Sequence, residues 1–164
     1  MEFNLDDLTP AMLQAVWIVV AIRFIIWAFY ANSVRRLLME IAEPNRFLRP
    51  NQAWLLIVPF FNIYWNFKVA RSVSNSLNNE FYDRKIAEEP SPGLVKGLSY
   101  AWMFLLSNIP FPAFLLLTFF MLGLIYFVQY WVKISNFRQL IVEHKRFTAM
   151  NEGKNLDKET HETP

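Results

Sequence analysis

A single arginine inside the first apolar run is the residue most able to do chemistry in this sequence. Arg23 lies near the middle of residues 11–31, a run about long enough to cross a bilayer. A cation at that depth costs roughly 2.5–3.5 kcal/mol on insertion scales. No acidic residue lies inside an apolar run. We expect Arg23 either to snorkel or bond the backbone broken at Pro59, or to meet a ligand, an ion or a partner chain. A cation–π contact with Trp27 is also open.

Two amides in the second apolar run are the next candidates. Asn62 and Asn66 follow Pro59 at helical spacing within residues 54–67. Amides inside a membrane commonly hold helices together, and they also line polar cavities at the broken helices of transporters. Both interpretations stay open for Asn62 and Asn66.

A polar stripe on the last apolar run adds Gln129. The members of this stripe recur at helical spacing: Tyr126, Gln129, Tyr130 and Lys133. Most of the stripe falls within two turns of the expected interface, where aromatic and basic residues anchor helices. An aromatic belt is the plain interpretation, and a polar pathway through Gln129 is the alternative.

Four arginines follow the first run and could hold lipid headgroups: Arg35, Arg36, Arg46 and Arg49. Each basic residue near an anionic surface contributes about 1 kcal/mol of attraction. The same residues could act only as determinants of topology. Arg36 could also pair with Glu40, four residues on.

Enzymatic motifs are missing. The chain has no cysteine, both histidines lie outside the apolar runs, and there is no glycine-rich phosphate loop and no HExxH. We therefore expect no enzyme, no cofactor and no metal. The net charge of +2 gives no reason to expect a nucleic acid partner.

The elements that position these residues are apolar helices. Hydrophobic residues make up 54% of the 164 residues and charged residues only 18%, against about 25% in soluble domains. The apolar residues gather in four hydrophobic segments: 11–31, 53–70, 94–109 and 113–134. We expect an all-α integral membrane protein, with interfacial amphipathic helices after Asn32 and over 72–84. Residues 1–150 would form a single helical membrane domain, and residues 151–164 a disordered cytoplasmic tail.

Pro59 breaks the second segment, which either spans the membrane or re-enters on the same side. If it spans, eleven basic residues lie inside and four outside. If it is re-entrant, the N-terminus is outside and all fifteen lie inside, as the positive-inside rule favours. Both arrangements place the C-terminus in the cytoplasm.

Several motifs together resemble a family of small bacterial multi-pass membrane proteins known as a domain of unknown function. The residues that carry the resemblance are Pro50, 54–57 (WLLI), 59–62 (PFFN), Trp65, Phe67, Ser76, Leu77, Glu80, Phe81, Pro92, Gly93, Gly97 and 130–134 (YWVKI). The likeness covers about residues 20–140. It implies a bacterial inner-membrane protein, and it brings no activity, substrate or catalytic residue.

The leading hypothesis is a non-enzymatic membrane subunit or scaffold that associates through its helices with other membrane proteins or with itself. The first alternative is a small oligomeric channel or transporter lined by Asn62, Asn66 and Gln129. The second is a protein that binds anionic lipid through the basic loop. Membrane lipids are partners in all three.

Overall fold

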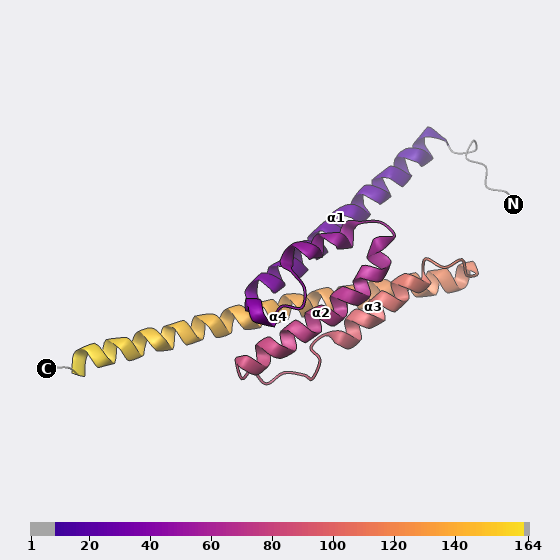
Figure 1. The fold of residues 1–164 in the computed structure, drawn as a ribbon. Coiled ribbons are helices and arrows are strands. Elements are labelled where there is room, and N and C mark those ends of the chain that lie inside the picture. The colour runs from indigo at the N-terminus through magenta and orange to yellow at the C-terminus, as the bar shows by residue number, and fades with distance from the viewer. Residues whose placement is uncertain (1–8, 163–164) are drawn as a thin grey trace.

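The structure is a computed structural model that describes residues 9–162, with side chains described to residue 154. Within that range the chain is all helical and has no strand, as expected from the sequence. The elements are α1 (Pro10–Glu40), the 3₁₀ helices η2 (Glu43–Asn45) and η3 (Pro50–Ile57), α2 (Phe61–Asp83), α3 (Leu94–Leu106) and α4 (Ala113–Glu162) (Figure 1).

Helix α1 runs without a break through the first apolar run and its amphipathic extension. Pro10 stands at its first position, and the Thr9 hydroxyl accepts a hydrogen bond from the Met12 backbone N–H at 3.4 Å. Only the C-terminal third is buried, from Tyr30 to Leu38. The expected continuation past Asn32 is therefore confirmed.

The second apolar run breaks at Pro59 and turns back on itself. The Trp65 indole N–H donates to the Gln52 carbonyl at 3.0 Å, and the Phe47 N–H donates to the Ser76 hydroxyl at 2.8 Å. These contacts pair residues before and after the turn in reverse order, so η3 and α2 form an antiparallel hairpin (Figure 1).

The amphipathic helix expected over residues 72–84 is helical as far as Asp83, as the C-terminal part of α2. This element is one helix from Phe61 to Asp83. No proline or glycine interrupts this stretch, and a continuous buried stripe that includes Val69, Val73 and Leu77 keeps it regular.

The turn at Pro59 satisfies its own backbone. The Pro59 carbonyl accepts from the Phe61 N–H at 2.6 Å, and the Val58 carbonyl accepts from the Asn62 N–H at 3.0 Å. Phe60 takes a positive φ of 60° with ψ of −46°, which is the rarer and strained kind of γ-turn. The broken backbone therefore needs no partner at these carbonyls.

Helices α3 and α4 form a second antiparallel hairpin, joined at residues 107–112. Helix α4 also packs beside α1, where the Trp131 indole N–H donates to the Ser33 hydroxyl at 2.9 Å. The helix continues to Glu162, into the segment for which the sequence predicts disorder. Residues 151–162 contain no proline, and the charged residues there tolerate a helix. Residues 163–164 lie outside the described residues.

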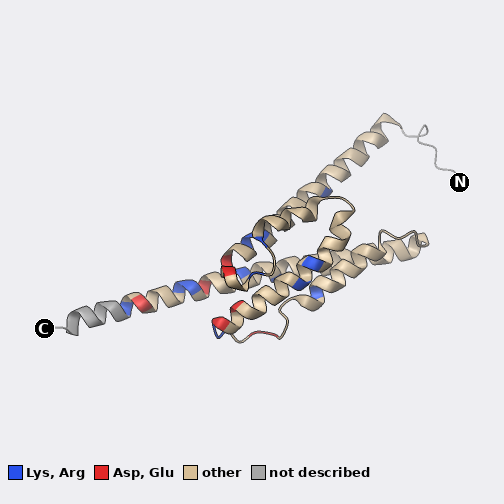
Figure 2. Ribbon diagram, in the orientation of Figure 1, with Lys and Arg blue, Asp and Glu red and all other residues tan. Residues whose placement is uncertain are grey.

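Two of the described helices, α1 and α4, are long and apolar enough to cross a membrane; α3 is apolar but shorter. Most charged residues lie toward one end of the ribbon, and a few basic positions on α1, α2 and α3 lie nearer its middle (Figure 2). The start of α1, the turn at Pro59 and the turn between α3 and α4 lie toward the other end (Figure 1).

Candidate functional site

Arg23 lies on the exposed part of α1, where its side chain comes near only the aromatic side chains of Trp27 on α1 and Phe104 on α3 among its described cation–π contacts. Its guanidinium carbon lies 4.5 Å from the centre of the Trp27 ring and 5.7 Å from that of Phe104. The expected contact with Trp27 is confirmed. In the described part of the chain, Arg23 forms no ion pair and no side-chain hydrogen bond. Its N–H donors are therefore free to meet an acceptor outside the chain.

The surface around Arg23 is apolar and exposed. The most apolar 18-residue window of α1 has none of its residues buried. The large exposed side chains on this part of α1 are Met12, Leu13, Val16, Trp17, Ile18, Val19, Ile22, Phe24, Ile25 and Ile26. We call residues 12–26 the uncovered half of α1. A contiguous apolar surface of this kind marks a contact with membrane or protein.

Asn62 and Asn66 lie together on the inner face of α2, where both are buried. Asn62 Nδ2 and Asn66 Oδ1 have no hydrogen-bond partner within the described residues. Gln129 lies elsewhere, on an exposed part of α4, where its carbonyl accepts from the Lys96 ammonium at 2.6 Å. The structure therefore does not bring Gln129 to the two asparagines, and Asn62 and Asn66 face the protein core.

The four arginines of the basic loop separate into different environments. Arg46 donates to the carbonyls of Ile41 at 2.8 Å and Met39 at 3.2 Å, and so closes the C-terminal end of α1. Arg35 donates to Asn51 at 3.4 Å, and the backbone N–H of Arg49 donates to Gln52 at 3.1 Å.

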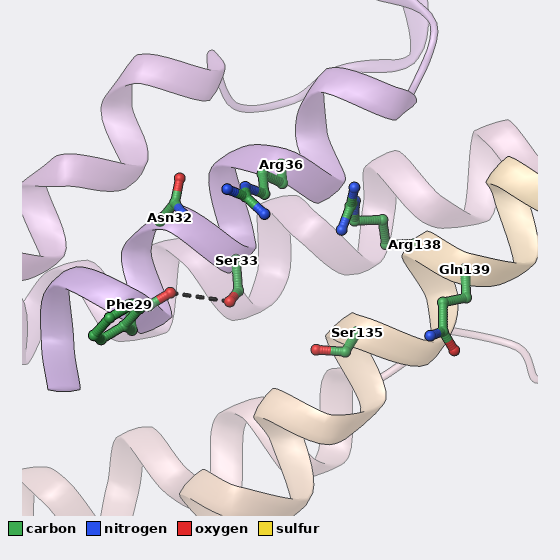
Figure 3. A pocket seen from close by; sticks show the side chains of 7 residues that line it. All are labelled: Phe29, Asn32, Ser33, Arg36, Ser135, Arg138 and Gln139. Carbon is green, nitrogen blue, oxygen red and sulfur yellow. Dashed lines mark hydrogen bonds between the residues drawn. The ribbon is translucent and has the colours of Figure 1, made fainter.

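Arg36 alone among these four lines the pocket between α1 and α4. The pocket has a volume of about 230 Å³ and is lined by Phe29, Asn32, Ser33, Arg36, Ser135, Arg138 and Gln139. Figure 3 shows Arg36 on α1 and Arg138 on α4, with the Arg138 guanidinium directed toward α1 and the Arg36 guanidinium directed toward Asn32. The expected pair of Arg36 with Glu40 is wrong, because the Glu40 carboxylate lies 2.9 Å from the Lys145 ammonium instead.

A buried carboxylate that the sequence interpretation missed ties the loop after α1 to α2. Glu80 is 1% exposed and accepts hydrogen bonds from the Ala42 N–H at 2.9 Å and the Asn45 amide at 3.0 Å. The Arg84 guanidinium lies 2.7 Å from its other oxygen. Glu80 continues the apolar stripe of Val73 and Leu77 at helical spacing, and that spacing was the available signal.

Burial alone would raise the pKa of Glu80, but hydrogen bonds from Asn45, Ala42 and Arg84, with the charge of Arg84, outweigh it. The pKa of this carboxyl therefore lies below its ordinary value. In the loop before α3, Glu89 contacts the Lys133 ammonium at 2.5 Å and the Gly93 N–H at 2.8 Å. These two hydrogen bonds likewise lower the pKa of Glu89.

No family model, curated protein or solved structure matches this chain. The resemblance carried by the Pro-Phe-Phe-Asn motif stays a prediction. The described fold is that of an all-helical protein with two helices that are able, by length and composition, to cross a membrane.

Proposed function

We propose that this chain is a non-enzymatic, multi-pass protein of the bacterial inner membrane that associates with another membrane protein through α1. The observation that carries the proposal is Arg23, a cation without an ion pair in the described chain, within the uncovered half of α1. A helix of this composition needs either lipid or another helix around it, and lipid tails offer a guanidinium no acceptor.

The hairpin of η3 and α2 supports one orientation in the membrane. Because this segment turns back at Pro59, residues 41–49 and 84–93 lie on the same side. The fifteen basic residues other than Arg23 then fall on one side, which the positive-inside rule makes cytoplasmic. In this orientation the N-terminus is outside, the C-terminus is cytoplasmic, and the η3–α2 hairpin enters and leaves on the cytoplasmic side.

The partner that fits Arg23 is a membrane helix with a hydrogen-bond acceptor at mid-bilayer depth. Packing such a helix on the uncovered half of α1 would enclose the guanidinium between Trp27 and the acceptor. Interhelical hydrogen bonds in membranes are worth about 0.6–2 kcal/mol each. The partner can be a second copy of this chain or a different protein.

Photo-crosslinking in intact cells tests the proposal. A photoreactive residue at Trp17 or Val19, both exposed on α1, should form a protein adduct of defined mass. Arg23→Leu should reduce that adduct at least fivefold, while Arg146→Gln, which removes an exposed cation beyond the apolar run of α4, should leave it unchanged. The leucine is more apolar than the arginine, so insertion itself is not impaired. Adducts with lipid alone, or an adduct that Arg23→Leu leaves unchanged, would overturn the proposal.

A further inference from the structure

The pocket between α1 and α4 holds two cations that no carboxylate of the described chain neutralises. Arg36 and Arg138 both line it (Figure 3), and neither forms an ion pair with a described residue. The nearest acidic candidate along α1, Glu40, is occupied by Lys145. The Nε of Arg138 is buried and has no hydrogen-bond partner within the described residues. Two guanidinium groups that face one cavity repel each other, and an anion between them would relieve the repulsion.

The position of the pocket along both helices is that of lipid headgroups. The apolar runs of α1 and α4 end at residues 31 and 134, and the polar lining residues follow directly. Phe29, 62% exposed, forms the apolar edge. Trp131, whose indole donates to Ser33 at the pocket wall, stands where aromatic belts stand.

Exposed apolar rows lead from this pocket along both helices. Ile22, Ile25 and Ile26 precede Phe29 at helical spacing on α1, and Ile125, Val128 and Val132 precede Ser135 on α4. The two helices lie side by side at the pocket and diverge beyond it (Figure 1). The rows give acyl chains a surface that begins at the polar lining.

We propose that this pocket binds the phosphate of an anionic membrane phospholipid, with Arg36 and Arg138 on the phosphate oxygens and the acyl chains along the two apolar rows. Guanidinium groups suit this ligand because their paired N–H donors match phosphate oxygens. The side-chain amides of Asn32 and Gln139 are further donors for the rest of the headgroup.

The size of the pocket agrees with this ligand. Its volume of about 230 Å³ is below the roughly 300–1,000 Å³ typical of pockets that enclose a drug-sized molecule. It suits a headgroup whose tails lie outside. The inference rests on the membrane placement proposed above, and it does not require the partner helix on the uncovered half of α1.

The test uses the full chain in mild detergent and native mass spectrometry with added phosphatidylglycerol or phosphatidylcholine. We expect retained phosphatidylglycerol, and at least tenfold less of it in Arg36→Gln and in Arg138→Gln. The control is Arg146→Gln, which removes the same charge from an exposed position of α4 and should retain lipid as the parent does. Arg138→Lys keeps the positive charge but loses the paired N–H donors of the guanidinium. Its retention of phosphatidylglycerol should fall between that of the parent and that of Arg138→Gln.

Three results would overturn the inference. Equal retention by Arg36→Gln, Arg138→Gln and the parent would exclude the pocket. Equal affinity for phosphatidylcholine would exclude recognition of net negative charge. Inorganic phosphate that binds alone and displaces the lipid at equal concentration would assign the pocket to free phosphate. Arg36→Gln and Arg138→Gln lie on different helices, so one misfolded variant leaves the other informative. Unchanged lipid retention in both pocket variants, together with an adduct at Trp17 that still depends on Arg23, would overturn this inference and leave the proposed function standing.

Discussion

The ring of Tyr130 on α4 packs directly against Gly97 on α3. A Cβ atom at Gly97 would lie 2.8 Å from Tyr130 Cζ and 2.8 Å from the Cβ of Ala70 on α2. Three helices therefore meet at one position that has room for no side chain. A residue without a side chain permits such close approach between helices.

Replacement of Gly97 by alanine should destabilise this junction. Overpacking costs about 1–3 kcal/mol, and the better helix propensity of alanine returns up to about 1 kcal/mol, so we expect a net loss near 1–2 kcal/mol. Thermal unfolding in detergent micelles, followed by circular dichroism, measures it. The matched control is Gly153→Ala on α4, where an added Cβ meets nothing within 4 Å. Equal stability of the two variants would contradict the packing at Gly97.

Replacement of Glu80 by glutamine should release the loop after α1. The carboxylate holds the Ala42 N–H, Asn45 and Arg84, and hydrogen bonds to a charged group contribute about 1.5–3 kcal/mol each. We expect a loss of that order in unfolding free energy, and faster proteolysis within residues 41–49. Glu43→Gln, at an exposed position of the same loop, should change neither.

The stability that Glu80 contributes should depend on pH. Its pKa in the folded state lies below the ordinary 4.5, so the folded state holds the ionised form more tightly than the unfolded state does. The contribution is complete above about pH 4.5 and is lost as pH falls through the lower folded pKa. The difference in melting temperature between the parent and Glu80→Gln should shrink below that pH. A difference that stays constant throughout the acid range would contradict the carboxylate network.

Replacement of Phe60 by glycine should relieve strain at the hairpin turn. Phe60 has φ of 60° and is 88% exposed, and such a backbone costs a bulky residue about 1–3 kcal/mol. We expect Phe60→Gly to raise the unfolding free energy by about 1 kcal/mol. Phe61→Gly should lower it instead, because the Phe61 ring stacks on Trp65 with centroids 5.1 Å apart. If Phe60→Gly destabilised the chain, the turn would have a different conformation.

Local chemistry made part of this fold predictable. The break at Pro59 follows from the missing N–H of proline, and the contact of Arg23 with Trp27 follows from helical spacing. Contacts between distant segments were not predictable in this way. Glu40 binds Lys145 rather than its helical neighbour Arg36, and only the packing of α1 on α4 decides between them. The pocket shared by Arg36 and Arg138 depends on the same packing.

Glu80 is an intermediate case. The helical spacing of the sequence predicts its position on the buried stripe of α2. Its partners Ala42 and Asn45 could not be predicted, because they lie far from it in the sequence and contact it only in the folded chain. Helix α4 continues past residue 150, although the sequence there has no apolar periodicity that would indicate a helix. A loss of apolar periodicity there removes the sign of a buried face, not the ability of the backbone to stay helical.

Accessibility of single cysteines to a membrane-impermeant thiol reagent tests the membrane account most directly, since the chain has no native cysteine to remove. Asn51→Cys and Asn79→Cys, both at exposed positions, should react only from the cytoplasmic side. Asn4→Cys, before the described residues, should react only from the opposite side. Reaction of Asn51→Cys and Asn79→Cys from opposite sides would mean that the second segment crosses the bilayer, and reaction of all three from one side would contradict the proposed orientation.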